Sequence, residues 1–318
     1  MLFRSRRAHV ALPKRIVIGT RGSALARTQT QWVISQLVAG HPGLDVQEQV
    51  ITTTGDRRTD QPLPEIGGKG LFTAELETAL LEGDIDAAVH SMKDLPTEMP
   101  DGLCVGAIPP RETPFDAVIS ADGSLLKDLP TGAKVGTSSR RRQAQLLAVR
   151  PDLRVESIRG NLDTRIRKLH DDDWDAIIAA AAGLARLGRL DEATEILTPE
   201  KMLPAVAQGA LAIQTRAGDD ATIQILSVIH DERTARGVAA ERAFLHALGG
   251  GCHVPIAGLA EVAATKDTLA LRGLVAAVDG SRDVRGSATG EVPEDVGREL
   301  ARELLDKGAA DLLAEGEE

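Results

Sequence analysis

Short apolar runs alternate with stretches of helical periodicity along most of the chain, which is typical of α/β proteins. Apolar residues that alternate or run together predict strands, and apolar residues three or four positions apart predict helices. In the first part of the chain these patterns predict strands at 15–20, 46–53 and 85–90, and helices at 23–38 and 71–81. This order predicts a first α/β unit.

A second set of elements follows the proline-rich connector Ile108-Pro109-Pro110-Arg111. The pattern predicts strands at 116–120, 134–137, 154–157 and 176–180, and helices at 139–149 and 162–169. We expect the apolar segment 203–213 to return the chain to the first unit.

From residue 227 onward the pattern changes to a helix at 231–248, strands at 256–262, 268–278 and 283–289, and a terminal amphipathic helix. The expected fold class is therefore α/β, with two α/β domains and a smaller C-terminal α+β domain. The expected divisions are a flexible N-terminal tail at 1–13, domain 1 at 14–109 plus 205–227, domain 2 at 110–204 and the C-terminal domain at 228–318.

Composition narrows the classes of function. The net charge of −10 argues against a general binder of polyanions, and with 2% aromatic residues and no tyrosine we expect no platforms for base stacking. The two cysteines lie far apart, and there is no secretory signal and no apolar run long enough for a membrane span, so we expect a cytoplasmic protein. No heptad pattern demands a partner, and we expect a monomer.

Positive charge is concentrated between Arg140 and Lys168. This stretch holds eight arginines and one lysine against three acids, a net charge of +6 in a chain whose total is −10. A solvated helix face is the ordinary explanation of such a run. An anion site is favoured instead, because the hydroxyls of Thr137 and Ser139 precede arginines at a helix N-terminus, where the helix dipole disfavours cations. Arginine also matches carboxylates and phosphates with paired hydrogen bonds.

Three other segments carry polar groups beside glycines. Arg159-Gly160-Asn161 precedes a predicted helix that carries Arg165, and Thr20-Arg21-Gly22-Ser23 follows the first strand, so both offer anion contacts. Lys69 lies in a glycine loop, but the loop lacks the glycine spacing and the Ser/Thr of a P-loop. Nucleotide binding by that route is not predicted.

Asp94 follows a short buried strand and stands next to Lys93. Ligands of open α/β sheets bind beyond the carboxyl ends of the strands, so Asp94 lies where chemistry is expected. An aspartate there can carry protons or stabilise a developing cation. The alternative is that Asp94 only forms the turn before Leu95 and Pro96.

Cys252 follows three glycines and precedes His253-Val254-Pro255. The glycines leave the sulfur without bulky neighbours, so a large group can approach it. Two interpretations stand, a free thiol in a tight turn or an attachment point. Cys104 lies in an apolar run, and we expect it to be a core thiol.

Taken together, these segments resemble the porphobilinogen deaminase (hydroxymethylbilane synthase) family. The matching motifs are GTRGSALARTQ, IGGKGLFTAELETALL, AVHSMKDLP, VGTSSRRRQAQL, IRGNLDTRIRKL, AAAGLARLG, LPAVAQGA and GGGCHVPIAG. They follow the family's order and spacing, and the C-terminal domain matches more loosely. His253 departs from the family, in which glutamine or another polar residue is common at that position.

The resemblance implies two domains like type II periplasmic binding proteins, with the active site between them. It also implies a dipyrromethane cofactor joined by a thioether to Cys252. Four porphobilinogen molecules would be condensed head to tail onto this primer with loss of ammonia, and hydroxymethylbilane would be released by hydrolysis. Asp94 matches the catalytic aspartate, which would assist departure of the amine and stabilise the positive charge that develops. Neither a metal, nor nucleic acid, nor a membrane is an implied partner.

Substrate chemistry would account for the arginines, because every porphobilinogen brings an acetate and a propionate. The resemblance assigns binding of cofactor or substrate to Arg21, Ser23, Gln29, Lys69, Phe72, Ser91, Lys93, Thr137, Ser139, Arg141, Arg142, Arg159, Gly160, Arg165, Arg186 and Gln208. The alternative function is a two-lobed receptor for an organic anion, without turnover. Cys252 and the Lys93–Asp94 pair favour the enzyme, because a receptor needs neither.

Overall fold

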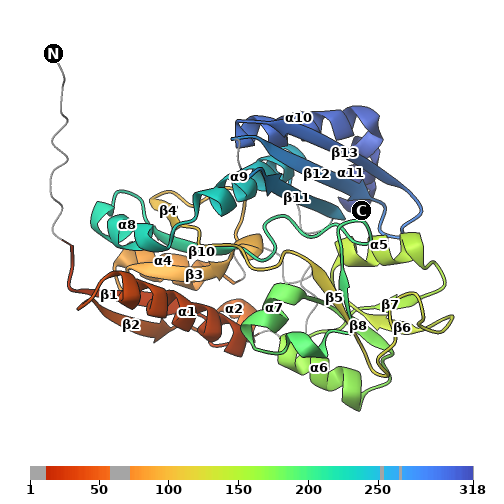
Figure 1. The fold of residues 1–318 in the computed structure, drawn as a ribbon, viewed down its shortest axis with the longest axis horizontal. Coiled ribbons are helices and arrows are strands. Elements are labelled where there is room, and N and C mark those ends of the chain that lie inside the picture. The colour runs from red at the N-terminus through yellow and green to blue at the C-terminus, as the bar shows by residue number, and fades with distance from the viewer. Residues whose placement is uncertain (1–11, 58–71, 251–253, 265–266, 318) are drawn as a thin grey trace.

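The computed structural model describes residues 12–57, 72–250, 254–264 and 267–317, which form three lobes, each built on one sheet (Figure 1). The strands of the first lobe are, in sheet order, β2 (Asp45–Val50), β1 (Arg15–Thr20), β3 (Ala87–Ser91), β10 (Leu211–Arg216) and β4 (Leu103–Ala107). β2, β1 and β3 are parallel, and β10 runs antiparallel to both of its neighbours.

Helices cover both faces of this first sheet. They are α1 (Ala24–Gly40), α2 (Thr54–Arg57), α4 (Ala74–Glu82), η1 (Met92–Asp94), α8 (Asp220–Leu226) and η3 (Ser227–Ile229). Ile16 and Ile18 of β1 pack with Val33 of α1 on one face, while Leu76 of α4 packs with Ala88 of β3 on the other. Because both faces are buried at the centre of the sheet, β1 and β3 are mainly apolar, whereas the edge strand β2 is largely polar and exposed.

The second lobe repeats this strand order. Its strands are, in sheet order, β7 (Arg154–Glu156), β6 (Lys134–Gly136), β8 (Ala176–Ala180), β5 (Asp116–Ser120) and β9 (Glu195–Leu197), with β5 antiparallel to both neighbours. Its helices are α5 (Arg140–Val149), α6 (Leu162–Asp171), α7 (Ala181–Arg186) and η2 (Leu190–Glu192). Val118 of β5 packs toward α5, and Ala117 and Ile119 pack toward α6 and α7.

The third lobe is a three-stranded antiparallel sheet with helices on one face (Figure 1). It comprises α9 (Glu232–Ala247), β11 (Ile256–Val262), β12 (Leu269–Ala276), β13 (Asp283–Gly290), α10 (Pro293–Leu304), the turn η4 (Leu305–Ala309) and α11 (Ala310–Glu317). Phe244 of α9 and Leu300 of α10 lie in its core. On the opposite face Leu274 packs with Ala144 of α5, so this lobe contacts the second.

Two segments that connect the first and second lobes lie side by side. The Glu112 amide donates to the Gly209 carbonyl at 3.2 Å. Gly209 has a φ of +88°, and a Cβ there would lie 2.4 Å from the Glu112 carbonyl oxygen, so only glycine fits this crossing. The third lobe holds the crossing through Glu241, which is fully buried and pairs with Arg111 at 2.6 Å.

The predicted fold class of two α/β units and a smaller α+β unit is confirmed. β10 confirms that the chain returns to the first unit after residue 203. The strand predicted at 46–53 was too long, since β2 ends at Val50, and β9 and α7 were not predicted. The division into domains by residue number stays a prediction. None of the described helices has both the length and the apolar character needed to cross a membrane.

Candidate active site

A pocket lies at the carboxyl ends of β1 and β3 in the first lobe. Among the residues that line it are the sequence-predicted Arg21, Ser23, Gln29, Phe72, Ser91 and Asp94. The strands end at Thr20 and Ser91, so the residues that follow them face the same space. The tertiary structure therefore brings these predicted residues together.

Asp94 ends the single turn η1 directly after β3, and it is exposed. Within the described ranges its carboxylate has no hydrogen bond and no ion pair, so it can accept a hydrogen bond from a ligand. The pocket wall beside it is ordered by Gln29, which is buried and whose Nε2 donates to Ser91 Oγ at 3.3 Å. Ser23 caps α1 by accepting from the Ala26 amide at 3.3 Å.

Arg21 is held on two sides. Its Nη2 lies 2.5 Å from Oδ1 of Asp56, and its guanidinium lies 4.2 Å from the centre of the Phe72 ring. Burial alone would raise the pKa of Asp56, but hydrogen bonds from Arg21 and Thr53 outweigh that effect and lower the pKa. Asp56 and Phe72 therefore fix the orientation of the Arg21 guanidinium where it lines the pocket.

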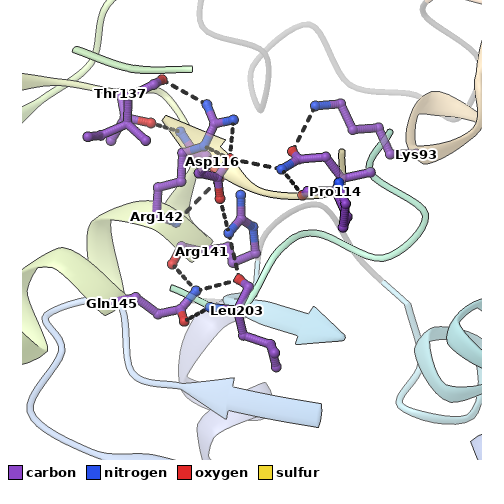
Figure 2. Close-up of polar contacts among 11 residues, drawn as sticks. Lys93, Pro114, Asp116, Thr137, Arg141, Arg142, Gln145 and Leu203 are labelled. Atoms are coloured by element: carbon purple, nitrogen blue, oxygen red, sulfur yellow. Dashed lines mark hydrogen bonds and ion pairs between the residues drawn. The ribbon is translucent and has the colours of Figure 1, made fainter. Parts of the chain in front are cut away.

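A second group of residues is organised around Asp116, which is fully buried at the start of β5 (Figure 2). Arg142 donates to Asp116 Oδ1 through Nε at 3.0 Å and Nη2 at 2.7 Å, and Arg141 Nη1 lies 2.8 Å from Oδ2. Burial would raise the pKa of Asp116, but the two guanidinium charges hold it well below its usual range. Asp116 was not among the residues predicted from the sequence, where its only signal was a lone carboxylate at the start of the apolar strand β5.

The start of α5 explains how its arginines reach this acid. Ser139 caps the helix by accepting from the Arg142 amide at 3.4 Å, and Thr137 Oγ1 accepts from the Ser139 amide at 3.2 Å. Arg141 also donates to the Leu203 carbonyl at 2.8 Å. Arg141 and Arg142 are each only 6% exposed, so these two guanidiniums are buried rather than presented to solvent.

Gln208 links Asp116 to the neighbour of Asp94. Its Nε2 donates to Asp116 Oδ1 at 2.9 Å and to the Pro114 carbonyl at 2.8 Å, while its Oε1 accepts from Lys93 Nζ at 3.1 Å (Figure 2). We call Asp116, Arg141, Arg142, Gln208 and Lys93 the Asp116 cluster. It spans the junction of the first two lobes and reaches the residue next to Asp94.

Lys93 has a perturbed ammonium. Burial lowers the pKa of Lys93 to about 8; the charge of Asp94 opposes the shift and the charge of Arg142 adds to it. The residue keeps an exposed surface, so solvent screens part of this effect. The partner of Lys93 is the neutral amide oxygen of Gln208, which does not offset the effect of burial as a carboxylate would.

The second lobe adds two further cations. Arg165 of α6 donates through Nε to the Gly160 carbonyl at 2.8 Å, and burial lowers the pKa of Arg165 to about 10, with the charges of Arg142 and Arg159 adding to the shift. Arg186 donates to the Gly209 carbonyl at 2.6 Å, and burial lowers its pKa as well.

Gly160 has a structural reason to be glycine. Its φ is +118°, and a Cβ there would lie 2.6 Å from Cγ2 of Thr164. This turn lets Asn161 cap α6 by accepting from the Thr164 amide at 2.9 Å. Lys69 and Cys252 lie outside the described residues, and their roles stay predictions.

Several solved structures share a partial likeness with the chain. The methionine-binding protein MetQ is 16% identical with a TM-score of 0.43, and the match covers 72% of this chain and 95% of that one. A YaeC-family lipoprotein from Enterococcus faecalis V583 is 19% identical with a TM-score of 0.42, covering 70% of this chain and 94% of that one.

Sequence relatives cover nearly the whole chain. The family model for the porphobilinogen deaminase dipyromethane cofactor binding domain matches residues 16–224, and the model for the C-terminal domain matches residues 235–306. A porphobilinogen deaminase of Bacillus subtilis (strain 168) is 51% identical over 94% of this chain and 95% of its own length. One of Maridesulfovibrio salexigens is 51% identical over 94% of this chain and 97% of its own length. The chain therefore belongs to the porphobilinogen deaminase family, and it is a transferase of porphyrin biosynthesis that polymerises porphobilinogen on a dipyrromethane cofactor.

Proposed function

We propose that condensation of porphobilinogen takes place where the first-lobe pocket meets the Asp116 cluster, with Asp94 as the catalytic carboxylate. Four substrate molecules add head to tail, ammonia leaves at each addition, and hydroxymethylbilane is released by hydrolysis. The dipyrromethane, when bound through Cys252, supplies the pyrrole carbon to which substrate adds. Binding of the substrate carboxylates and stabilisation of the developing charge are assigned to side chains of the protein.

An excess of positive charge beside Asp94 carries this proposal. The pKa values of Lys93, Arg165 and Arg186 all lie below their ordinary values, because partial loss of hydration disfavours each charge and nearby carboxylates do not fully compensate for it. A group that brings several carboxylates would supply the missing negative charge. The residues present therefore fit dipyrromethane and its extended chain, which carry an acetate and a propionate on each ring.

We assign the binding of carboxylates to the cations around the pocket. Lys93, Arg165 and Arg186 are the primary contacts because their charge is least compensated, and Arg159 assists from beside Arg165. Arg21 acts from the first-lobe side, where Asp56 and Phe72 orient its guanidinium. Arginine suits this task because its planar fork pairs with a carboxylate through two hydrogen bonds.

Asp94 acts on the reacting part of the substrate. Its carboxylate, without a partner in the described ranges, can accept an N–H from the substrate. As ammonia departs, a fixed negative charge at this position stabilises the positive charge that develops on the substrate. The neighbouring Lys93 holds a substrate carboxylate, so that one turn both orients the substrate and stabilises its charge.

Intact mass spectrometry of the purified protein and of Cys252→Ser tests the proposal. We expect the wild-type chain to exceed its sequence mass by two condensed pyrrole units and to give a colour with Ehrlich's reagent. Cys252→Ser should fold but carry no added mass and form no product, because a hydroxyl is a far weaker nucleophile than a thiolate. An unmodified wild-type mass in cells that make porphobilinogen, or an active Cys252→Ser, contradicts the proposal.

We extend the proposal to a monomer that works in the cytoplasm. The support for the monomer is the net charge of −10, which disfavours self-association. Sedimentation equilibrium at micromolar concentration should give the mass of one chain. A dimer mass under those conditions contradicts the monomer.

A further inference from the structure

Asp116 does not line the pocket, yet it contacts Arg141 and Arg142 and is linked through Gln208 to Lys93. We infer that Asp116 is a positioning residue whose carboxylate fixes Arg141 and Arg142, and through Gln208 the ammonium of Lys93, before a ligand binds. The inference rests on the proposed function, because the ligand that it serves is a chain of pyrrole carboxylates. It goes further in naming a residue that never contacts that ligand.

The two carboxylate oxygens of Asp116 contact different partners. Oδ1 accepts from Arg142 through two nitrogens and from Gln208 Nε2, and Oδ2 faces Arg141 Nη1 at 2.8 Å (Figure 2). Asp116 is fully buried, so water does not compete for either oxygen. A single carboxylate therefore sets the positions of two guanidiniums from the first turn of α5.

The charge of Asp116 also determines which way the Gln208 amide points. The Pro114 carbonyl and the Asp116 carboxylate can only accept hydrogen bonds, so Nε2 of Gln208 must face them. Oε1 is then left to face Lys93 Nζ, at 3.1 Å. Lys93 is in this way anchored by a neutral oxygen, which orients the ammonium without cancelling its charge.

The charge balance of the cluster fits this role. Arg141, Arg142 and Lys93 carry three positive charges against the single negative charge of Asp116, and the charge of Asp94 beside Lys93 reduces the balance to +1. One carboxylate is enough to orient the cations and too little to neutralise them. The remaining charge is available to the acetate and propionate groups of the ligand.

Asp116→Asn tests the inference because it keeps the shape of the side chain and removes its charge. Whichever way the amide turns, its NH2 group faces a donor, either Arg141 Nη1 or the donors of Arg142 and Gln208, so at least one of these contacts is lost. We expect the fraction of chains that carry dipyrromethane to fall, or the KM for porphobilinogen to rise, by about tenfold or more, with a smaller change in kcat. Circular dichroism shows whether the variant is folded.

Asp152→Asn is the matched control. Asp152 forms a paired contact with Arg150 in the same lobe, at 2.8 and 2.7 Å, and belongs neither to the pocket nor to the Asp116 cluster. We expect wild-type cofactor loading and a wild-type KM from this variant.

The reactivity of Lys93 separates positioning from a general loss of stability. The charges that face Lys93 are Asp94 and Asp116, which raise its pKa, and Arg141 and Arg142, which lower it. Pulse acetylation with acetic anhydride across a pH series, read by peptide mass spectrometry, gives the midpoint of its titration. We expect this midpoint to move to lower pH in Asp116→Asn, whereas a loss of structure would expose Lys93 and move the midpoint to higher pH.

If Asp116→Asn does not fold, Gln208→Met keeps the ion pairs of Asp116 and removes only the link to Lys93. We expect a raised KM and a lower Lys93 midpoint there as well. A wild-type KM, loading and Lys93 midpoint in the folded Asp116→Asn or in Gln208→Met overturn the inference. A wild-type protein without pyrrole mass and without product overturns the proposed function instead, so the two failures are distinguishable.

Discussion

We expect kcat/KM to fall at alkaline pH as Lys93 loses its proton. Lys93→Arg tests this, because arginine does not lose its proton in that range. Burial lowers the pKa of Lys93 to about 8, and the neighbouring arginines add to that shift. A lysine is charged below its pKa and neutral above it, so the ammonium is present at neutral pH and is lost as the pH rises through about 8. Arginine stays protonated over this whole range.

The size of the effect follows from one contact. A hydrogen bond to a charged group contributes roughly 1.5–3 kcal/mol, so its loss weakens binding of a carboxylate by roughly 10- to 150-fold. Lys93 keeps an exposed surface, and screening by solvent reduces the value of the contact. We therefore expect the lower end of this range, a fall of about tenfold in kcat/KM on the alkaline side.

Initial rates of the loaded enzyme, measured at several pH values on both sides of the Lys93 titration, give the profile of kcat/KM. The wild type should fall with a midpoint near the pKa of Lys93. Lys93→Arg should be less active at neutral pH, because the longer guanidinium misplaces the carboxylate, but it should lack that midpoint. Titration of the substrate's own amine is common to both proteins and cancels in the comparison. A flat wild-type profile, or the same midpoint in both proteins, refutes the reasoning.

Three further changes test other parts of the structure. Asp94→Asn should retain the dipyrromethane mass and lower kcat by about 100- to 10,000-fold, and near-normal turnover would remove Asp94 from the mechanism. Glu241→Gln should lower the free energy of unfolding by about 3 kcal/mol in urea titrations, because the half-buried Arg111 would lose its carboxylate; an unchanged midpoint would contradict this. Gly160→Ala should cost about 1–3 kcal/mol, because its Cβ meets Thr164 at a positive φ, and a neutral result would show that the turn relaxes freely.

Much of the fold was predictable because its signals are local. β1, β5, β8 and β11 were predicted at the residues where they are found, since buried strands are short apolar runs bounded by polar or turn residues. Ser23 and Ser139 were predicted as contacts for an anion, and the structure shows that each also caps a helix by accepting from a free amide of the first turn. The short strand β9 was missed because three residues carry too little periodicity.

The candidate site was predictable in its parts but not in its connections. The concentration of arginines and the position of Asp94 indicated an anion site from the sequence. The resemblance to a family then supplied substrate and cofactor. What the sequence could not indicate is that Arg141 and Arg142 are buried against an acid, because each was expected to face a ligand directly.

The amino-acid sequence by itself determined the strands and helices, the excess of cations and the acid after β3, since each depends on residues that are neighbours along the chain. Only the tertiary structure decided which cations are held and which remain available. Asp116 lies 26 positions from Arg142, which it meets through the packing of α5 on β5, and 92 positions from Gln208, which it meets because the chain crosses back between the lobes. The physical reason is that a buried carboxylate gains its partners from packing, and packing brings together residues whose separation along the chain carries no periodic signal.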